Sequence, residues 1–491
     1  MLLAFATPQI DYHAFAPELV LTGALVVLLL VDLASDRNRP LLGAVAGIGL
    51  LASMVPVLTL AVDGADRSMF GGAYVVDNFA LTMKALFLIS GYVVVLLSTN
   101  YIAEGDYYEG EYYFLLLSSI LGMTIMASSR DLISIFVALE TLSIPAYMLA
   151  TWRKRDDKSN EGGLKYYLMG VFATAIMLYG MSLIFGVTGS TVLTQIGAVL
   201  SQTGTKPIVT LGVIFCVVGF AFKVSAVPFH TWAPDTYQGA PTPITAFLSV
   251  GSKAAGFVAI MELVFIGFFN QHEIWEPMFW VLAVLTMTIG NLIALRQTNV
   301  VRLFAYSSIA QAGYMLAPLA VAGTAATRDQ SISATVVYLL VYSAMNLGAF
   351  AVIITVARKT RSAELSSFGG LFEYAPGLAV LMTVFLFALA GIPPLGGWFA
   401  KFVIFRATAG AGTGAGYTLA VFVAVNSVIA LFYYARIAQE MWFKPVPDGD
   451  TTPVRIPPAL GAALGICVLA TVAIGFYPQI VGRLGDMAHL V

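Results

Sequence analysis

The residues with the clearest capacity for chemistry are lysines that fall in long apolar segments. Lys223, Lys253 and Lys401 lie within such segments, and Lys84 and Lys165 lie near the ends of two others. Burial of a lysine in lipid is costly, and a desolvated lysine can lose its proton, whereas an arginine stays protonated. We place no arginine in these segments, so the pattern predicts a set of proton-transfer groups.

Glu140, in FVALETLSIPAYML, is the only acid that we expect deep within an apolar segment. An unpaired carboxylate there would take up a proton, so its natural partner is a buried lysine of another segment. We therefore predict an ion pair between Glu140 and Lys223. The alternative is a carboxyl group that only makes structural hydrogen bonds.

Lys223 lies just before a break in its apolar segment, in AFKVSAVPFHTWAPDTYQGAPTP. Pro228 and Pro234 interrupt the helix there, and the backbone groups freed at such a break need water or polar partners. This favours proton transfer by Lys223 over snorkelling of its ammonium group to the membrane interface. His230, inside the break, either shuttles protons or satisfies the freed backbone groups.

Lys401 follows a second break, in ALAGIPPLGGWFAKF, where Gly391, Pro393 and Pro394 interrupt the apolar segment. Here the lysine comes after the break, whereas Lys223 comes before its own, and the two segments are expected to cross the membrane in opposite directions. Broken helices at corresponding positions of two inverted halves mark transport sites in membrane transporters. The sequence therefore predicts two broken helices, each with a lysine beside its break, in opposite orientations across the membrane.

The remaining charged residues in apolar segments differ in how strongly they point to function. Lys253 lies about 18 Å into its segment, too deep to snorkel easily, and small residues surround it. Lys165 follows Glu161 by four residues and either joins a proton path or forms a surface pair. Glu262 either relays protons toward the exit or faces the interface, and Lys84 lies close enough to a segment end to snorkel.

Composition assigns the chain to a fold class. Of its 491 residues, 59% are hydrophobic and 11% are charged, against about 25% charged in soluble proteins. The sequence therefore predicts an all-α polytopic membrane protein. The net charge of −2 offers no basic surface for nucleic acid, and the two cysteines and four histidines show no metal-ligand spacing. We expect no metal and no bound cofactor in this chain.

The apolar segments predict about fourteen transmembrane spans. They are 17–33, 41–62, 79–99, 112–128, 131–151, 163–187, 207–226, 241–268, 276–295, 301–322, 332–357, 376–409, 416–441 and 458–481.

Spans 4–8 and 9–13 are expected to form two inverted five-helix repeats, with spans 7 and 12 broken. We divide the chain into an N-terminal part (1–110), the first repeat (111–270), the second repeat (271–441) and the last span (442–491). The distribution of basic residues between alternate loops places both termini on the periplasmic side. The N-terminus shows no removable signal peptide.

Three stretches together resemble the antiporter-like membrane subunits of proton-pumping NADH–quinone oxidoreductase, respiratory complex I. They are FKVSAVPFHTWAPDTYQGAPTPITAFLSVGSK, ALAGIPPLGGWFAKF and the segment around Glu140. Within that family the sequence is most similar to the subunits designated N, because Lys401 stands where subunit M typically carries a glutamate and no long lateral helix follows the last span. Multisubunit sodium–proton antiporters share these motifs and are the alternative. A membrane subunit with a purely structural role is a third hypothesis.

The resemblance implies roles for residues at matching positions. Glu140 and Lys223 match an ion pair, Lys253 matches the central lysine, and Lys401 matches the exit residue of the proton path. Lys165 matches a lysine seen in subunit N. Several relatives also carry a histidine near the central lysine, which this sequence lacks, so we expect water or a serine in its place.

The resemblance also implies the function, location and partners of the chain. The chain is expected to move protons across the bacterial cytoplasmic (inner) membrane, driven by redox chemistry in partner subunits. NADH, FMN, iron–sulphur clusters and quinone are expected elsewhere in the complex. The expected partners are the other membrane and peripheral subunits and lipids, with no nucleic acid.

Overall fold

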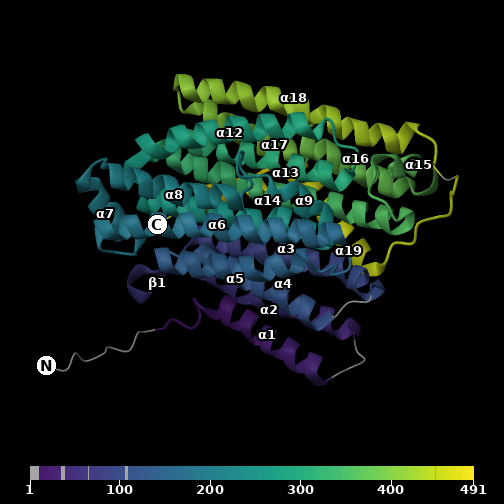
Figure 1. Ribbon diagram of the computed structural model, residues 1–491, viewed down its shortest axis with the longest axis horizontal. Coiled ribbons are helices and arrows are strands. Elements are labelled where there is room, and N and C mark those ends of the chain that lie inside the picture. The colour runs from purple at the N-terminus through teal and green to yellow at the C-terminus, as the bar shows by residue number, and fades with distance from the viewer. Residues whose placement is uncertain (1–9, 35–38, 65, 106–108, 448, 491) are drawn as a thin grey trace.

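The computed structural model describes residues 10–34, 39–64, 66–105, 109–447 and 449–490 and shows a bundle of helices. The long helices lie side by side, with α1 and α2 at one edge of the bundle and α18 at the opposite edge (Figure 1). Helices are the expected solution in lipid, because every backbone N–H and C=O group must find its partner within the protein. The predicted all-α membrane fold is confirmed.

The helices of the first part of the chain follow the predicted spans closely. They are α1 (Ala16–Ala34), α2 (Arg39–Asp63), α3 (Asn78–Glu104), α4 (Glu109–Ser128), α5 (Leu132–Ala150), α6 (Asp157–Thr188), α7 (Leu193–Thr203), α8 (Pro207–Lys223), α9 (Trp232–Gly239), α10 (Thr242–Phe247) and α11 (Lys253–Glu262). A short antiparallel hairpin, β1 (Arg67–Met69) and β2 (Tyr74–Val76), connects α2 to α3.

The second part continues in the same manner. Its helices are α12 (His272–Ala294), α13 (Val300–Leu316), α14 (Ala325–Thr360), α15 (Leu371–Tyr374), α16 (Pro376–Ala390), α17 (Gly396–Gly410), α18 (Gly414–Phe443), α19 (Pro458–Phe476) and α20 (Gln479–Met487). Short 3-10 turns occur at 70–72, 269–271, 318–321 and 365–368.

Within the described ranges, eleven helices are long and apolar enough to cross a membrane. The shorter apolar helices α8 and α16 are the first halves of the two broken spans. The count of fourteen spans, the orientation and the division at residues 110, 270 and 441 remain predictions.

Both predicted breaks are present. The first separates α8 from α9, and the second separates α16 from α17. Pro228 lies within the first break, but Pro234 lies in the first turn of α9, where a proline is tolerated because its missing N–H would have no helical partner. Our assignment of Pro234 to the interruption itself was therefore wrong. In the second break, Pro393 and Pro394 follow the end of α16.

Two helices run through the centre of the molecule. α14 packs against α3, α13, α16, α17 and α19, and most of its length is buried. α11 is fully buried and is flanked by two π-helical turns, Leu248–Ser252 and Leu263–Gly267. Such turns widen a helix locally and are frequent at functional sites. One of them ends immediately before Lys253, and the other begins immediately after Glu262.

Candidate functional site

Lys223 is the last residue of α8, and its ammonium group is buried at the first break. Its Nζ donates to Ser143 Oγ of α5 at 2.8 Å and approaches the hydroxyl of Tyr166 in α6 at 3.5 Å. Gly256 of α11 makes room for this lysine, because a Cβ atom there would lie 3.1 Å from Lys223 Cγ. The lysine therefore meets hydroxyl groups from two other helices.

Glu140 does not form the predicted ion pair with Lys223. It is partly exposed and makes no ion pair with any described residue. It lies in a stripe of α5 whose neighbours Val137 and Ile144 are exposed apolar side chains, so it faces the outside of the chain. Ser143, one turn further along α5, takes the position next to the lysine, and the charge of Glu140 acts on Lys223 only at longer range.

Lys253 begins α11 in the middle of the bundle. Its Nζ donates to the backbone carbonyl of Ser308 in α13 at 2.7 Å and to the hydroxyl of the same residue at 2.6 Å. The preceding residue, Ser252, lies near the Tyr166 hydroxyl that also approaches Lys223. The expectation that water or a serine takes the place of the relatives' histidine stays a prediction.

Lys401 lies in α17, and its ammonium group folds back onto the broken end of α16. Its Nζ donates to the carbonyl of Ala390 at 2.8 Å and lies 4.9 Å from the ring centre of Tyr314. The last carbonyl groups of a helix have no helical partner and carry partial negative charge, so they favour a cation. The amide of Gln311 donates to the adjacent carbonyl, that of Leu389, at 3.4 Å.

Helix α13 contributes residues beside both Lys253 and the carbonyl end of α16 that Lys401 contacts. Ser308, the partner of Lys253, and Gln311, one turn further, lie on the same face of this helix. Gln311 also contacts the hydroxyls of Tyr338 and Tyr434. Each of the lysines at 223, 253 and 401 therefore contacts hydroxyl or carbonyl groups of other helices in the buried centre of the bundle.

Gly391 is required at the second break for two reasons. Its φ is +91°, and a Cβ atom there would lie 2.7 Å from Lys401 Cδ. We expect Gly391→Ala to destabilise the protein by about 1–2 kcal/mol from the left-handed conformation alone and to displace the lysine. The measurements are the apparent Tm and the proton-pumping rate in the assembled complex. Gly377→Ala is the control, because a Cβ atom there meets nothing within 4 Å; equal behaviour of the two variants would contradict the expectation.

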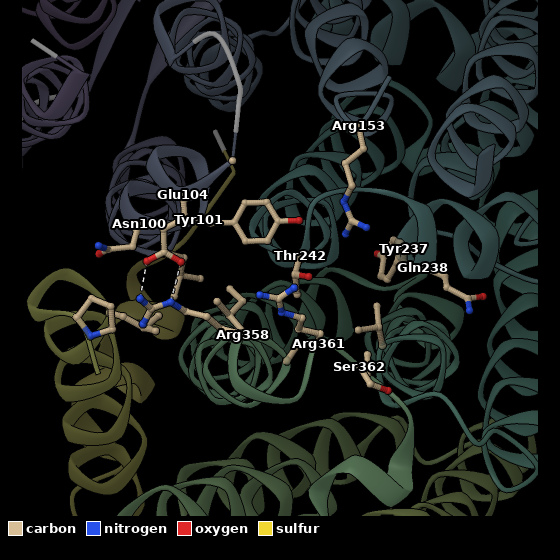
Figure 2. A pocket seen from close by; sticks show the side chains of 18 of the residues that line it. Asn100, Tyr101, Glu104, Arg153, Tyr237, Gln238, Thr242, Arg358, Arg361 and Ser362 are labelled. Carbon is tan, nitrogen blue, oxygen red and sulfur yellow. Dashed lines mark hydrogen bonds and ion pairs between the residues drawn. The ribbon is translucent and has the colours of Figure 1, made fainter. Parts of the chain in front are cut away.

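A polar cavity of about 460 Å³ lies at one end of the bundle (Figure 2). Arg153 comes to it from the segment after α5, and Arg358 and Arg361 come from the last turn and the C-cap of α14. Glu104 pairs with Arg358. Its wall includes Tyr237, whose hydroxyl lies near Ser308, the partner of Lys253. The cavity therefore approaches the central lysine from this end.

Lys165 and His230 lie outside the buried connection. Lys165 is partly exposed and pairs with Glu161 and with Asp235 of α9, each at 2.6 Å. Asp235 also accepts from Arg302 of α13 at 2.6 Å, so this carboxylate ties α6 and α9 to α13. His230 is half-buried in the first break, and its Nδ1 has no hydrogen-bond partner in the described part of the chain.

A second group of buried charges was not predicted to lie together. Arg130, which we assigned to a loop, is fully buried and pairs with Asp77 and Glu262. Lys84 does not snorkel, because it is fully buried and pairs with Glu18 of α1 at 2.9 Å. Glu262 is likewise buried and does not face the interface. Glu140 is thus not the only acid within the apolar segments, and the buried cations are not all lysines.

Comparison with known proteins places the chain in a family. Residues 129–430 match the family model described as "NADH:quinone oxidoreductase/Mrp antiporter, TM". NADH-quinone oxidoreductase subunit N of Trichlorobacter lovleyi is 39% identical over 484 residues, covering 98% of this chain and 97% of the relative. NAD(P)H-quinone oxidoreductase subunit 2 of Synechococcus elongatus is 39% identical over 479 residues, covering 95% of this chain and 90% of the relative.

Solved structures share the fold. A chain of respiratory complex I from Thermus thermophilus superposes with a TM-score of 0.79 at 32% identity, covering 95% of this chain and 98% of that one. A chain of the Mrp complex from Dietzia sp. has a TM-score of 0.86 at 22% identity, covering 98% and 97%, and this likeness concerns the fold alone. The extent and identity of these matches show that the chain belongs to the NADH-quinone oxidoreductase subunit N family.

Proposed function

We propose that this chain is a proton-translocating membrane subunit of an NADH–quinone oxidoreductase. The observation that carries the proposal is the burial of Lys223, Lys253 and Lys401, each bonded to hydroxyl or carbonyl groups of other helices, two of them beside the two breaks. Membrane interiors tolerate ionisable groups of this kind chiefly where protons or ions move. The names of the relatives support the assignment to this enzyme complex.

The proposed route begins at the polar cavity of Figure 2 and reaches Lys253 past Tyr237 and Ser308. From Lys253 the proton moves along the face of α13 to Lys401. We call this row of groups, from Lys253 to Lys401, the proton axis. Lys223 exchanges protons with it through Tyr166 and Ser252. Coupled groups of this kind titrate together, so no single residue has a pKa of its own.

Glu140 acts at the edge of this axis. Because it faces outward from α5, its charge depends on what covers that surface in the assembled complex. A partner cation that attracts or shields Glu140 would change the electrostatic support of the protonated Lys223 and favour release of its proton. Lys165, His230 and Glu262 are secondary members of the path in this proposal.

The energy comes from partner subunits. We place NADH, FMN, the iron–sulphur clusters and quinone in those subunits, as the family implies, and we place the chain in the bacterial cytoplasmic membrane with both termini periplasmic. The reaction of this chain is then a transfer of protons between its own side chains, without a redox step of its own.

The alternative is a subunit of a multisubunit sodium–proton antiporter, which the matching family model favours because its description also names the Mrp antiporter. Co-purification decides between them: companions that reduce quinone with NADH support the proposal, and companions that exchange Na⁺ for H⁺ without redox chemistry overturn it.

Lys401→Met tests the site itself. This substitution keeps the length of the side chain and removes the titratable group, so we expect proton release by the assembled complex in vesicles to fall. Unchanged proton release and unchanged quinone reduction would contradict a role for the Lys401 side chain in the path.

A further inference from the structure

Most of the buried charged side chains outside the three-lysine site form one cluster at the other end of the bundle. The cluster comprises Glu18 of α1, Asp77 and Lys84 of α3, Arg130 between α4 and α5, and Glu262 of α11, all essentially without solvent exposure. The cluster lies at the beginning of α3, and the cavity of Figure 2 lies at the end of the same helix. At 1.5 Å per residue, the two ends of α3 are about 40 Å apart.

The contacts within the cluster are short and specific. Arg130 donates from Nη2 to Asp77 Oδ2 at 2.8 Å and from Nη1 to Glu262 Oε1 at 2.6 Å. Lys84 Nζ lies 2.9 Å from Glu18 Oε1 and donates to the hydroxyl of Tyr74 in β2 at 2.8 Å. The N-terminal helices are thereby tied to α11, the helix that carries Lys253.

The charges of this cluster do not balance. Three carboxyl groups face two cations, Lys84 and Arg130, and Tyr74 is the other titratable side chain in contact with them. Asp131, next in sequence to Arg130, has its carboxylate engaged by the first N–H groups of α5. A net negative charge in a buried site is strongly unfavourable, and a buried acid in this position takes up a proton instead.

The surroundings of the three acids indicate which one holds that proton. Asp77 caps α3, where its Oδ1 accepts from Ala80 N at 2.7 Å in addition to the bond from Arg130. Glu18 lies in the first turn of α1 and has Lys84 as its partner. Both positions near a helix N-terminus favour a negative charge.

Glu262 has the least support for a negative charge. It shares Arg130 with Asp77, whereas Glu18 has Lys84 to itself. Oε2 of Glu262 has no hydrogen-bond partner in the part of the chain that the structure describes, and the same is true of both carboxylate oxygens of Glu18, so the shared cation is what distinguishes Glu262. It also lies in the last turns of its helix, where the partial charge of the helix end disfavours an anion.

We infer that Glu262 is a neutral carboxylic acid at rest, with the proton on Oε2, and that it is the proton-releasing group of the first repeat. In the release step the O–H bond of Oε2 breaks, the proton leaves toward the end of the bundle that carries the β1–β2 hairpin, and Arg130 compensates the carboxylate that remains. The part concerning release rests on the proposed function. Glu262 is reloaded from Lys253, about 14 Å earlier along the same helix, a distance that requires intermediate water molecules.

The protonation state is tested by amide substitutions in the assembled complex. Glu262→Gln resembles the protonated acid, so we expect the apparent Tm of the complex to stay close to that of the wild type. Asp77→Asn and Glu18→Gln remove ionised partners of buried cations and are expected to lower the Tm and the yield of the complex. A loss of stability in Glu262→Gln as large as in Asp77→Asn would overturn the inference.

Infrared difference spectroscopy gives a readout that a purely structural glutamate would not affect. We expect a carboxylic-acid C=O band that shifts in ²H₂O, changes during NADH-driven turnover, is lost in Glu262→Gln and persists in Glu262→Asp at a shifted frequency. A band of the wild-type complex that is unchanged in Glu262→Gln would overturn the inference.

Lys253→Met separates this inference from the proposed function. We expect the variant to retain the resting Glu262 band and to lose its change during turnover. If Lys253→Met pumps protons normally while the band is present, the proposed proton axis is wrong and the inference that Glu262 is neutral at rest is retained. If pumping depends on Lys253 but no band belongs to Glu262, the inference that Glu262 is neutral at rest is wrong and the proposed proton axis is retained.

Discussion

Lys253→Met is expected to decrease proton-coupled quinone reduction by the assembled complex about a hundredfold, the smaller end of what a positioned proton-transfer group contributes. Methionine has nearly the length of lysine and no titratable group, so packing around α11 is kept while both bonds to Ser308 are lost. The measurements are NADH–quinone turnover and the number of protons released per NADH in sealed vesicles, after assembly has been checked by co-purification.

Lys206→Met is the matched control for this variant. Lys206 is exposed at the start of α8, and its side chain makes no ion pair with any described residue, so turnover and stoichiometry are expected to stay at wild-type values. Wild-type values in Lys253→Met as well would show that the central lysine is structural and that protons take another route.

Arg130→Met is expected to give the largest loss of stability, about 3–5 kcal/mol, because removal of one partner of a buried ion pair leaves uncompensated charge. The guanidinium reaches Asp77 and Glu262 with two different nitrogen atoms, and methionine replaces neither contact. The expected result is a strongly reduced amount of chain in the membrane and a lower apparent Tm of whatever assembles.

Two further variants show whether geometry or charge is responsible. Arg130→Lys keeps the charge but presents it as one compact group that cannot fork between two carboxyl groups, so an intermediate loss is expected. Arg67→Met removes a partly exposed arginine that pairs with Asp11 beside the same hairpin, and such pairs contribute about 0–1 kcal/mol. Equal stability of Arg130→Met and Arg67→Met would mean that the buried cluster does not stabilise the fold.

The sequence by itself determined the membrane class, the positions of the long helices and the two breaks. Each of these depends on local information: the length of an apolar run, and the effect of Pro228, Pro393 and Pro394 on the hydrogen bonds of their own helix. The deep positions of Lys223, Lys253 and Lys401 followed from the same local reading, since depth in a span is a count along one helix.

Only the tertiary structure decided which charged groups meet. Arg130 and Glu262 are separated by 132 positions in the sequence, and nothing near either residue indicates the other. Arg130 was misassigned because it falls between two apolar segments, where a loop arginine normally reaches water, and the hairpin and surrounding helices cover it here.

The expected partnership of Glu140 and Lys223 failed for a related reason. Both residues lie within spans, but the side of α5 on which a residue points depends on how that helix packs. Packing turns Ser143 toward Lys223 and leaves Glu140 on the outward face. Hydropathy shows how deep a residue lies along its own span, whereas the partner of a buried charge is fixed by helix rotation and by contacts between distant segments, which only the folded chain specifies.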